Sequence, residues 1–173
     1  MAKRSSKKGI VITAAIITGI IAVSALIWVL PQGNTSATNI TDGDFSPEEI
    51  ANRPADNLAF VTDSHRIMIA EVEQAYEKWV DDEVSSNDIR TDIDNIRLRT
   101  EQLGNRLEGS IPTQWQNSYS LYSQAFVKFD EYLQEIESQV NSNDKDQEPP
   151  ALVAISDEME RLIQQSINSF PTT

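Results

Sequence analysis

Apolar residues are distributed along this chain in two ways, as one continuous run near the start and as periodic stripes later. Residues Gly9–Leu30, GIVITAAIITGIIAVSALIWVL, carry no charged side chain, and the run ends at Pro31. At about 1.5 Å per residue, a helix of this length spans about 33 Å and crosses a hydrocarbon core of about 30 Å. The run therefore predicts a transmembrane helix.

From residue 56 onward, apolar residues recur every three or four positions, which is typical of helices that bury one face. The first such segment carries Leu58, Val61, His65, Met68, Val72, Ala75 and Trp79. The second, which Ser85 or Ser86 can cap and Gly109 can end, carries Ile89, Ile93, Ile96, Leu103 and Leu107. The third, opening at Pro112 and Thr113, carries Trp115, Tyr119, Tyr122, Phe126, Phe129, Leu133, Ile136 and Val140. The last, between Pro150 and Pro171, carries Leu152, Ile155, Met159, Leu162, Ile163 and Ile167.

These segments predict an all-α fold, in which residues 56–170 form an antiparallel bundle of three to four helices. Coiled-coil-like packing is a variant, because the apolar positions repeat at about 3.5 residues. No segment alternates with period two for long enough to form a strand. We expect the third segment to lie at the centre, because its aromatic side chains can bury the most area.

The residues around the apolar run predict how the chain is placed in the membrane. Residues 1–8 include Lys3, Arg4, Lys7 and Lys8 and no acid, so the positive-inside rule places this tail in the cytoplasm and the domain outside the cell. Residues 31–55 have the composition of an extracytoplasmic linker. Within this linker, Asn34 and Asn39 each begin an acceptor pattern for N-glycosylation.

Two other interpretations of the N-terminus remain open. Thr35 and Ala37 could precede the cut of a secretory signal, although the apolar run exceeds the roughly 7 to 15 residues of such signals. The stretch Lys8-Gly9-Ile10-Val11 resembles the cleavage site of type IV pilin-like precursors. However, Ala14 stands where many pilins carry Glu, and the alternating strands of a pilin head are missing. An uncleaved signal-anchor is our prediction.

Charge and composition limit the partners of the domain. The chain of 173 residues has a formal charge of −13, and removing the four basic residues of the tail gives −13 − 4 = −17 for the rest. Such a field opposes binding to nucleic acid and favours solubility or cationic partners. The chain has no cysteine, so apolar packing alone must stabilise the fold.

The sequence offers little catalytic chemistry. His65 is the only histidine, and its position in the first apolar stripe predicts a packed residue. Asp63 or Ser64 beside it is interpreted as a cap near a helix start, rather than the two as members of a catalytic triad. The acidic groups Asp81-Asp82-Glu83 and Asp157-Glu158 are expected at helix ends and on polar faces. We therefore name no catalytic, cofactor-binding or metal-binding residue and predict that the protein is not an enzyme.

Two groups of residues bear on contacts with other proteins. The second segment interleaves Arg90, Arg97, Arg99 and Arg106 with Asp92, Asp94, Glu101 and Glu108, which predicts a salt-bridged surface. The aromatic residues of the third segment are predicted to form the core. If Tyr122 and Tyr132 faced outward instead, that helix would be a docking face.

The stretch Thr62–Met68, TDSHRIM, leads into Glu71-Val72-Glu73. Together with the lysine-flanked single span and the cysteine-free acidic domain, it resembles uncharacterised small single-span membrane proteins of ammonia-oxidising archaea. Such proteins generally have no assigned activity. Because some small helical membrane proteins of those organisms are regarded as accessory subunits of the ammonia monooxygenase, the resemblance implies an accessory role.

The sequence thus predicts a non-enzymatic accessory or scaffold subunit that contacts membrane lipid through Gly9–Leu30 and a protein partner through its domain. One alternative is an extracytoplasmic ligand-sensing or solute-binding domain. A sensor would need a partner across the membrane, because residues 1–8 leave no room for an output domain. A type IV pilin-like subunit is the further alternative.

Overall fold

The computed structural model describes residues 47–145 and 149–171, which belong to one compact unit, Asp44–Thr173. Its elements are α2 (Pro47–Asn52), α3 (Pro54–Val80), α4 (Ser86–Gly104), η1 (Asn105–Leu107), η2 (Thr113–Trp115), α5 (Gln116–Ser142) and α6 (Pro150–Asn168). The described residues are helical and include no strand, which confirms the all-α prediction. Among them, no helix combines the length and the apolar character needed to cross a membrane. The predicted span Gly9–Leu30 and the acceptors Asn34 and Asn39 lie outside the described residues.

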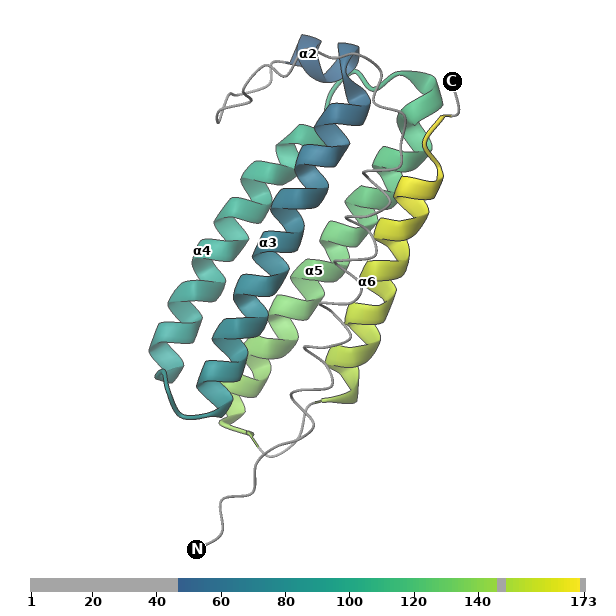
Figure 1. Ribbon diagram of the computed structural model, residues 1–173. Helices are drawn as coiled ribbons and strands as arrows, with labels where there is room; N and C mark the ends of the chain where they lie inside the picture. The colour runs from purple at the N-terminus through teal and green to yellow at the C-terminus, as the bar shows by residue number, and fades with distance from the viewer. Residues whose placement is uncertain (1–46, 146–148, 172–173) are drawn as a thin grey trace, which may run out of the picture. The chain divides into compact units, whose positions relative to one another are not determined.

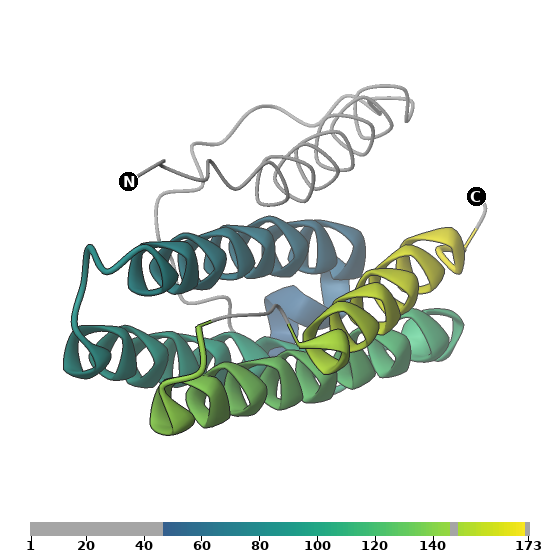
Figure 2. The same ribbon diagram turned by 90° about the horizontal axis from the view of Figure 1, so that it is seen from below.

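The four long helices run alternately up and down, as the predicted antiparallel bundle requires (Figure 1). Helix α5 contacts α3, α4 and α6, whereas α3 packs mainly against α4. Seen from below, α4 and α5 lie side by side along the bundle (Figure 2). The third predicted segment is therefore the central helix.

The bundle begins earlier than the sequence predicts. Helix α2 lies within the stretch interpreted as linker, and α3 starts at Pro54. Proline suits the first turn of a helix, because the N–H that it lacks would have no partner there. Ile50 of α2 is 4% exposed and belongs to the hydrophobic core, although one apolar side chain in a polar stretch gave no periodic signal.

The predicted apolar stripes are the core of the bundle. Every member of the first stripe, from Leu58 to Trp79, is buried, and so is every member of the third from Tyr119 to Val140. Trp115 instead precedes α5, where it lies half-buried with its ring centroid 5.0 Å from that of Phe170. The predicted core is thus confirmed except at this helix end and at Ile155 and Ile167 of the last stripe, which are only partly buried against it.

Burial also extends beyond the stripes. Asn57 and Thr62 on α3, and Ser118, Ala125 and Tyr132 on α5, are buried beside them. A strict coiled-coil seam would leave these flanking positions outside. The wider face arises because α5 touches three neighbours, as helices of globular bundles do.

Small polar residues hold α5 against α6. The Ser166 hydroxyl donates to the Ser118 carbonyl at 2.8 Å, and the hydroxyls of Ser118 and Ser169 lie 2.8 Å apart. Ser118 and Ser166 are fully buried. Their short side chains let the two helices approach closely while each hydroxyl keeps a partner.

Helix α4 begins with a cap at Ser85, one of the two residues that the sequence offered for this role. The Ser85 hydroxyl accepts a hydrogen bond from the Asp88 N–H at 3.3 Å, and the Asp88 carboxylate accepts one from the Ser85 N–H at 2.9 Å. This reciprocal pair satisfies two backbone donors that the helix leaves without partners. Helix α4 ends at Gly104, earlier than predicted, and Gly109 lies in the following connection with φ +122°.

Substitution Ser85→Ala should lower the free energy of unfolding by about 1 kcal/mol, because the Asp88 N–H loses its acceptor. Urea unfolding of the full chain in detergent, followed by circular dichroism, measures the change. Ser120→Ala, at an exposed position inside α5, is the control and should cause no loss. Equal losses in the two variants would contradict the capping role of Ser85.

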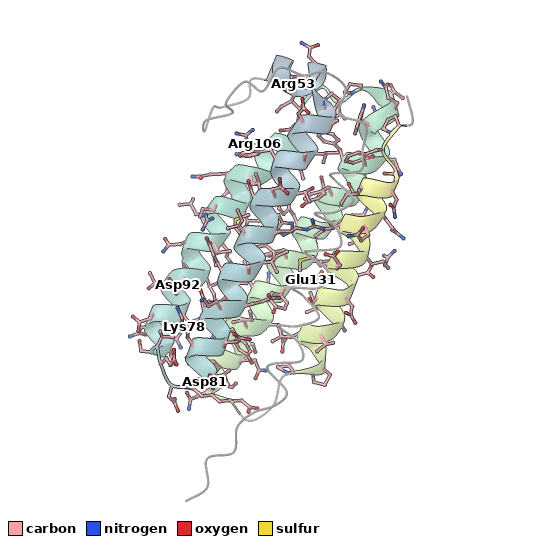
Figure 3. The ribbon with its side chains drawn as sticks, viewed as in Figure 1. Arg53, Lys78, Asp81, Asp92, Arg106 and Glu131 are labelled. Atoms are coloured by element: carbon pink, nitrogen blue, oxygen red, sulfur yellow. The ribbon has the colours of Figure 1, made fainter. Side chains whose placement is uncertain are left out.

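The C-terminal end of α3 is capped by a side chain from the connection after α5. The Lys145 ammonium donates to the Trp79 carbonyl at 2.6 Å, pairs with Asp82 and lies 4.7 Å from the centroid of the Trp79 ring. A cation is favourable at this position, since the last carbonyls of a helix carry partial negative charge. Lys78 and Asp81 mark the same end of the bundle in Figure 3.

We expect Lys145→Met to lower the free energy of unfolding by about 1–2 kcal/mol, because a charge-assisted hydrogen bond to a helix terminus is lost. The matched control is Lys78→Met, which removes the same charge from an exposed side chain of the same helix turn. It should change stability by less than about 0.5 kcal/mol. A loss of equal size in both variants would show that general charge, rather than the contact with Trp79, is responsible.

Candidate functional site

The only imidazole of the protein lies inside the bundle. His65, in the middle of α3, is fully buried, and its Nδ1 lies 3.3 Å from the Tyr122 hydroxyl. Its ring centroid is 4.6 Å from that of Phe126 and 4.8 Å from that of Phe129. Nε2 has no hydrogen-bond partner among the described residues. The prediction of a packed histidine is confirmed.

Burial decides the protonation state of this group. It lowers the pKa of His65 from 6.5 to about 3, with a smaller lowering from the charge of Arg66. Burial likewise raises the pKa of Tyr122 above its usual value. Both side chains are therefore neutral near pH 7, and they form a polar pair within an aromatic core rather than an acid–base pair open to substrate.

The sequence neighbours of His65 do not form a site with its side chain. Asp63 and Ser64 lie well inside α3, which starts at Pro54, so the interpretation of either residue as a helix cap is wrong. Asp63 is exposed whereas His65 is buried, so the two side chains point to different surroundings. The sequence placed a helix start too late, because Pro54 lies before the first periodic apolar residue.

The acidic groups lie where the sequence placed them. Asp81, Asp82 and Glu83 are exposed just after α3, and Glu158 pairs with Arg161 one turn away on α6. That hydrogen bond is the main cause of the lowered pKa of Glu158. In the described part of the chain, no three His, Cys, Asp or Glu residues are grouped so that they could hold a metal ion.

Sequence reasoning missed a second buried polar cluster near α2. The Asn57 amide donates to the Arg106 carbonyl at 2.8 Å and to the Tyr119 hydroxyl at 3.1 Å. Tyr119 in turn donates to the Pro54 carbonyl at 3.0 Å, and burial raises its pKa. The cluster ties the start of α3 to η1 and α5. The spacing of the residues could have indicated that Asn57 is buried, since Asn57 precedes Val61 of the apolar stripe by one helical turn.

The arginines of α4 connect helices rather than pairing mainly along their own. Arg97 lies 2.9 Å from Glu137 and 3.5 Å from Asp130, both on α5, but 3.9 Å from Asp94 on α4. Arg99 pairs with Glu71 of α3. The predicted salt-bridged surface is present, but its principal partners come from neighbouring helices, which the sequence pattern of one helix does not reveal.

The end of α4 shows a further contact of this kind. The Arg106 guanidinium lies 4.3 Å from the centroid of the Phe60 ring on α3. Arg106 and Arg53 are both found at the α2 end of the bundle (Figure 3). Stacking on an aromatic face adds a cation–π attraction that is independent of carboxylates.

The alternative of an aromatic docking face on α5 is wrong. It required Tyr122 and Tyr132 to face outward, and they are 1% and 7% exposed. The aromatic residues of α5 from Tyr119 onward fill the core, because α5 is surrounded by three helices. Tyr122 and Tyr132 therefore offer no contact surface.

A groove of about 640 Å³ lies between α4 and α5. Its apolar residues are Leu107, Phe126, Val127 and Leu133, and its charged residues are Arg97, Glu101, Glu108 and Asp130. Val127 is 60% exposed. We call this surface the α4–α5 groove.

Comparison with protein-family models, curated proteins and solved structures finds no match to this chain. The resemblance to small archaeal single-span proteins therefore stays a prediction, as does an accessory role taken from it.

Proposed function

We propose that this protein is a non-enzymatic accessory or scaffold subunit that acts through contacts with other proteins. The observation that carries the proposal is the α4–α5 groove, where Val127 is exposed beside charged residues. Apolar side chains that border a groove and are rimmed by polar residues are typical of interaction sites. The imidazole that could otherwise support chemistry is sealed in the core.

The bundle is suited to present such a surface without changing shape. Aromatic and aliphatic side chains fill the space between the helices, and Arg97 and Arg99 tie α4 to α5 and α3. A preorganised surface loses less conformational entropy when a partner binds. This rigidity supports the role of a scaffold.

Our proposal places the bundle on the extracytoplasmic side of a membrane, held by an uncleaved helix at Gly9–Leu30. The uncharged run and the basic residues before it support this topology. Mass spectrometry of the protein isolated from its own cells tests it, with peptides covering Lys8 to Ile12 expected. A mature terminus at Ile10 would favour the pilin-like alternative, and one after Ala37 would show a cleaved signal.

Chemical cross-linking of native membranes, followed by mass spectrometry, tests the scaffold role itself. We expect cross-links from the bundle to a protein partner that recurs in independent preparations. The control is the same preparation without cross-linker. Failure to recover any reproducible partner would contradict the proposed function.

A further inference from the structure

We propose that the α4–α5 groove binds an amphipathic helix of a partner protein whose polar face is rich in lysine and arginine. The inference rests on the proposed scaffold function and names the chemistry of the partner. It is argued from three properties of the groove: its open α4 side, its apolar margins and its charge.

The groove is open at its α4 side. A Cβ atom added to Gly104 would meet no atom within 4 Å, so no side chain occupies this point at the end of α4. The lining runs along α4 from Arg97 to Gly104 and continues through η1 to Glu108. An elongated groove beside a neighbouring helix suits a partner helix laid along it.

The apolar residues define what the partner must present. Val127 on α5 is the exposed apolar anchor, and Phe126 and Leu133 line the groove beside it with little or no exposure. A helix that docks against these residues would place apolar side chains at intervals of three and four residues, because only these positions share one face.

The charges select a cationic partner. Glu101, Glu108 and Asp130 line the groove against the single cation Arg97. Arg97 is already held by Glu137 and Asp130, so its charge is compensated within the bundle. A helix with lysine and arginine at its margins would meet the remaining carboxylates, whereas an acidic helix would be repelled.

The test uses the full chain in zwitterionic lipid nanodiscs and two synthetic helical peptides. Both peptides place leucine on one face, and the other face is lysine in the first and glutamate in the second. Fluorescence anisotropy measures binding, with empty nanodiscs as the lipid control. We expect the lysine peptide to bind the protein at least about tenfold more tightly than the glutamate peptide.

Matched variants separate the groove from the general acidity of the domain. Val127→Lys places a cation in the groove, while Ile67→Lys and Val153→Lys add the same charge at positions 56% and 44% exposed on other helices. The groove variant should weaken binding of the lysine peptide about tenfold, since the anchor is lost and a like charge is added. The two control variants should change it less than about twofold.

Several results would overturn the inference. Equal weakening by Ile67→Lys and Val127→Lys would show that net charge alone attracts the peptide. Equal binding of both peptides would show that the carboxylates of the groove do not select a cationic partner. A dimer of the full chain that Val127→Lys dissociates would assign the groove to a second copy instead.

The two proposals can fail separately. If native membranes yield a reproducible partner whose cross-links avoid α4 and α5, the scaffold function stands and the groove inference is wrong. If no partner is recovered but the lysine peptide binds with the expected pattern, the groove binds a cationic helix and the scaffold function is wrong.

Discussion

Replacing Phe129 by alanine should lower the free energy of unfolding by about 3–5 kcal/mol, because the central helix would lose a fully buried ring and keep a cavity. The ring packs 4.8 Å from His65 between centroids, at the point where α3 meets α5. Losses of this size are a large share of the stability of a small domain. Urea unfolding of the full chain in detergent, followed by circular dichroism, measures the effect.

The control for this prediction lies two residues away on the same helix. Val127 is 60% exposed, so Val127→Ala should change the free energy of unfolding by less than about 0.5 kcal/mol. Because alanine has a higher helix propensity than valine, any change in this control should be stabilising. A small effect of Phe129→Ala, similar to that of Val127→Ala, would show that α5 does not lie at the centre of the core.

Acid should destabilise the bundle through His65. Its pKa is about 3 in the folded protein and returns to its ordinary 6.5 in the unfolded chain. Above about pH 6.5 neither state binds a proton, and the contribution to stability is complete. Between about pH 6.5 and 3 only the unfolded chain binds the proton, so stability falls by about 1.4 kcal/mol per pH unit. Below about pH 3 the folded state is protonated too, and the loss stops.

The measurable consequence is a loss of about 2 kcal/mol between about pH 7.5 and pH 5 that depends on this one imidazole. His65→Gln, which keeps a polar group but cannot titrate, is the control for the carboxylates that also change charge. The pH dependence of the variant should be smaller than that of the wild type by that amount. Identical pH profiles of the two proteins would show that His65 is not sealed from water.

Much of the core follows from periodicity alone. The stripe from Leu58 to Trp79 and the stripe from Tyr119 to Val140 are buried as predicted, because a spacing of three and four residues places side chains on one face of any helix. The cap at Ser85 is equally local, since its acceptor and donor lie within one turn. These features depend on short stretches of chain, so sequence reasoning can reach them.

The pairing of charges and the α4–α5 groove could not be predicted in the same way. The contact between Arg97 and Glu137 joins residues 40 positions apart, and the partner depends on which helices become neighbours. Asn57 can be buried in the core because its amide donates hydrogen bonds to the Tyr119 hydroxyl and the Arg106 carbonyl. Long-range hydrogen bonds and ion pairs need a tertiary arrangement before their members can be named.

The sequence by itself determined that this chain has one uncharged run of membrane-spanning length, an acidic helical domain, and buried stripes centred on the third predicted helix. The tertiary structure decided that His65 contacts Tyr122 in a sealed core, and that Val127 lines a groove between α4 and α5. Periodicity specifies which face of a helix is buried. It does not specify which neighbouring helix covers each edge of that face. The packing of α4 beside α5 forms the groove on which the proposed function rests.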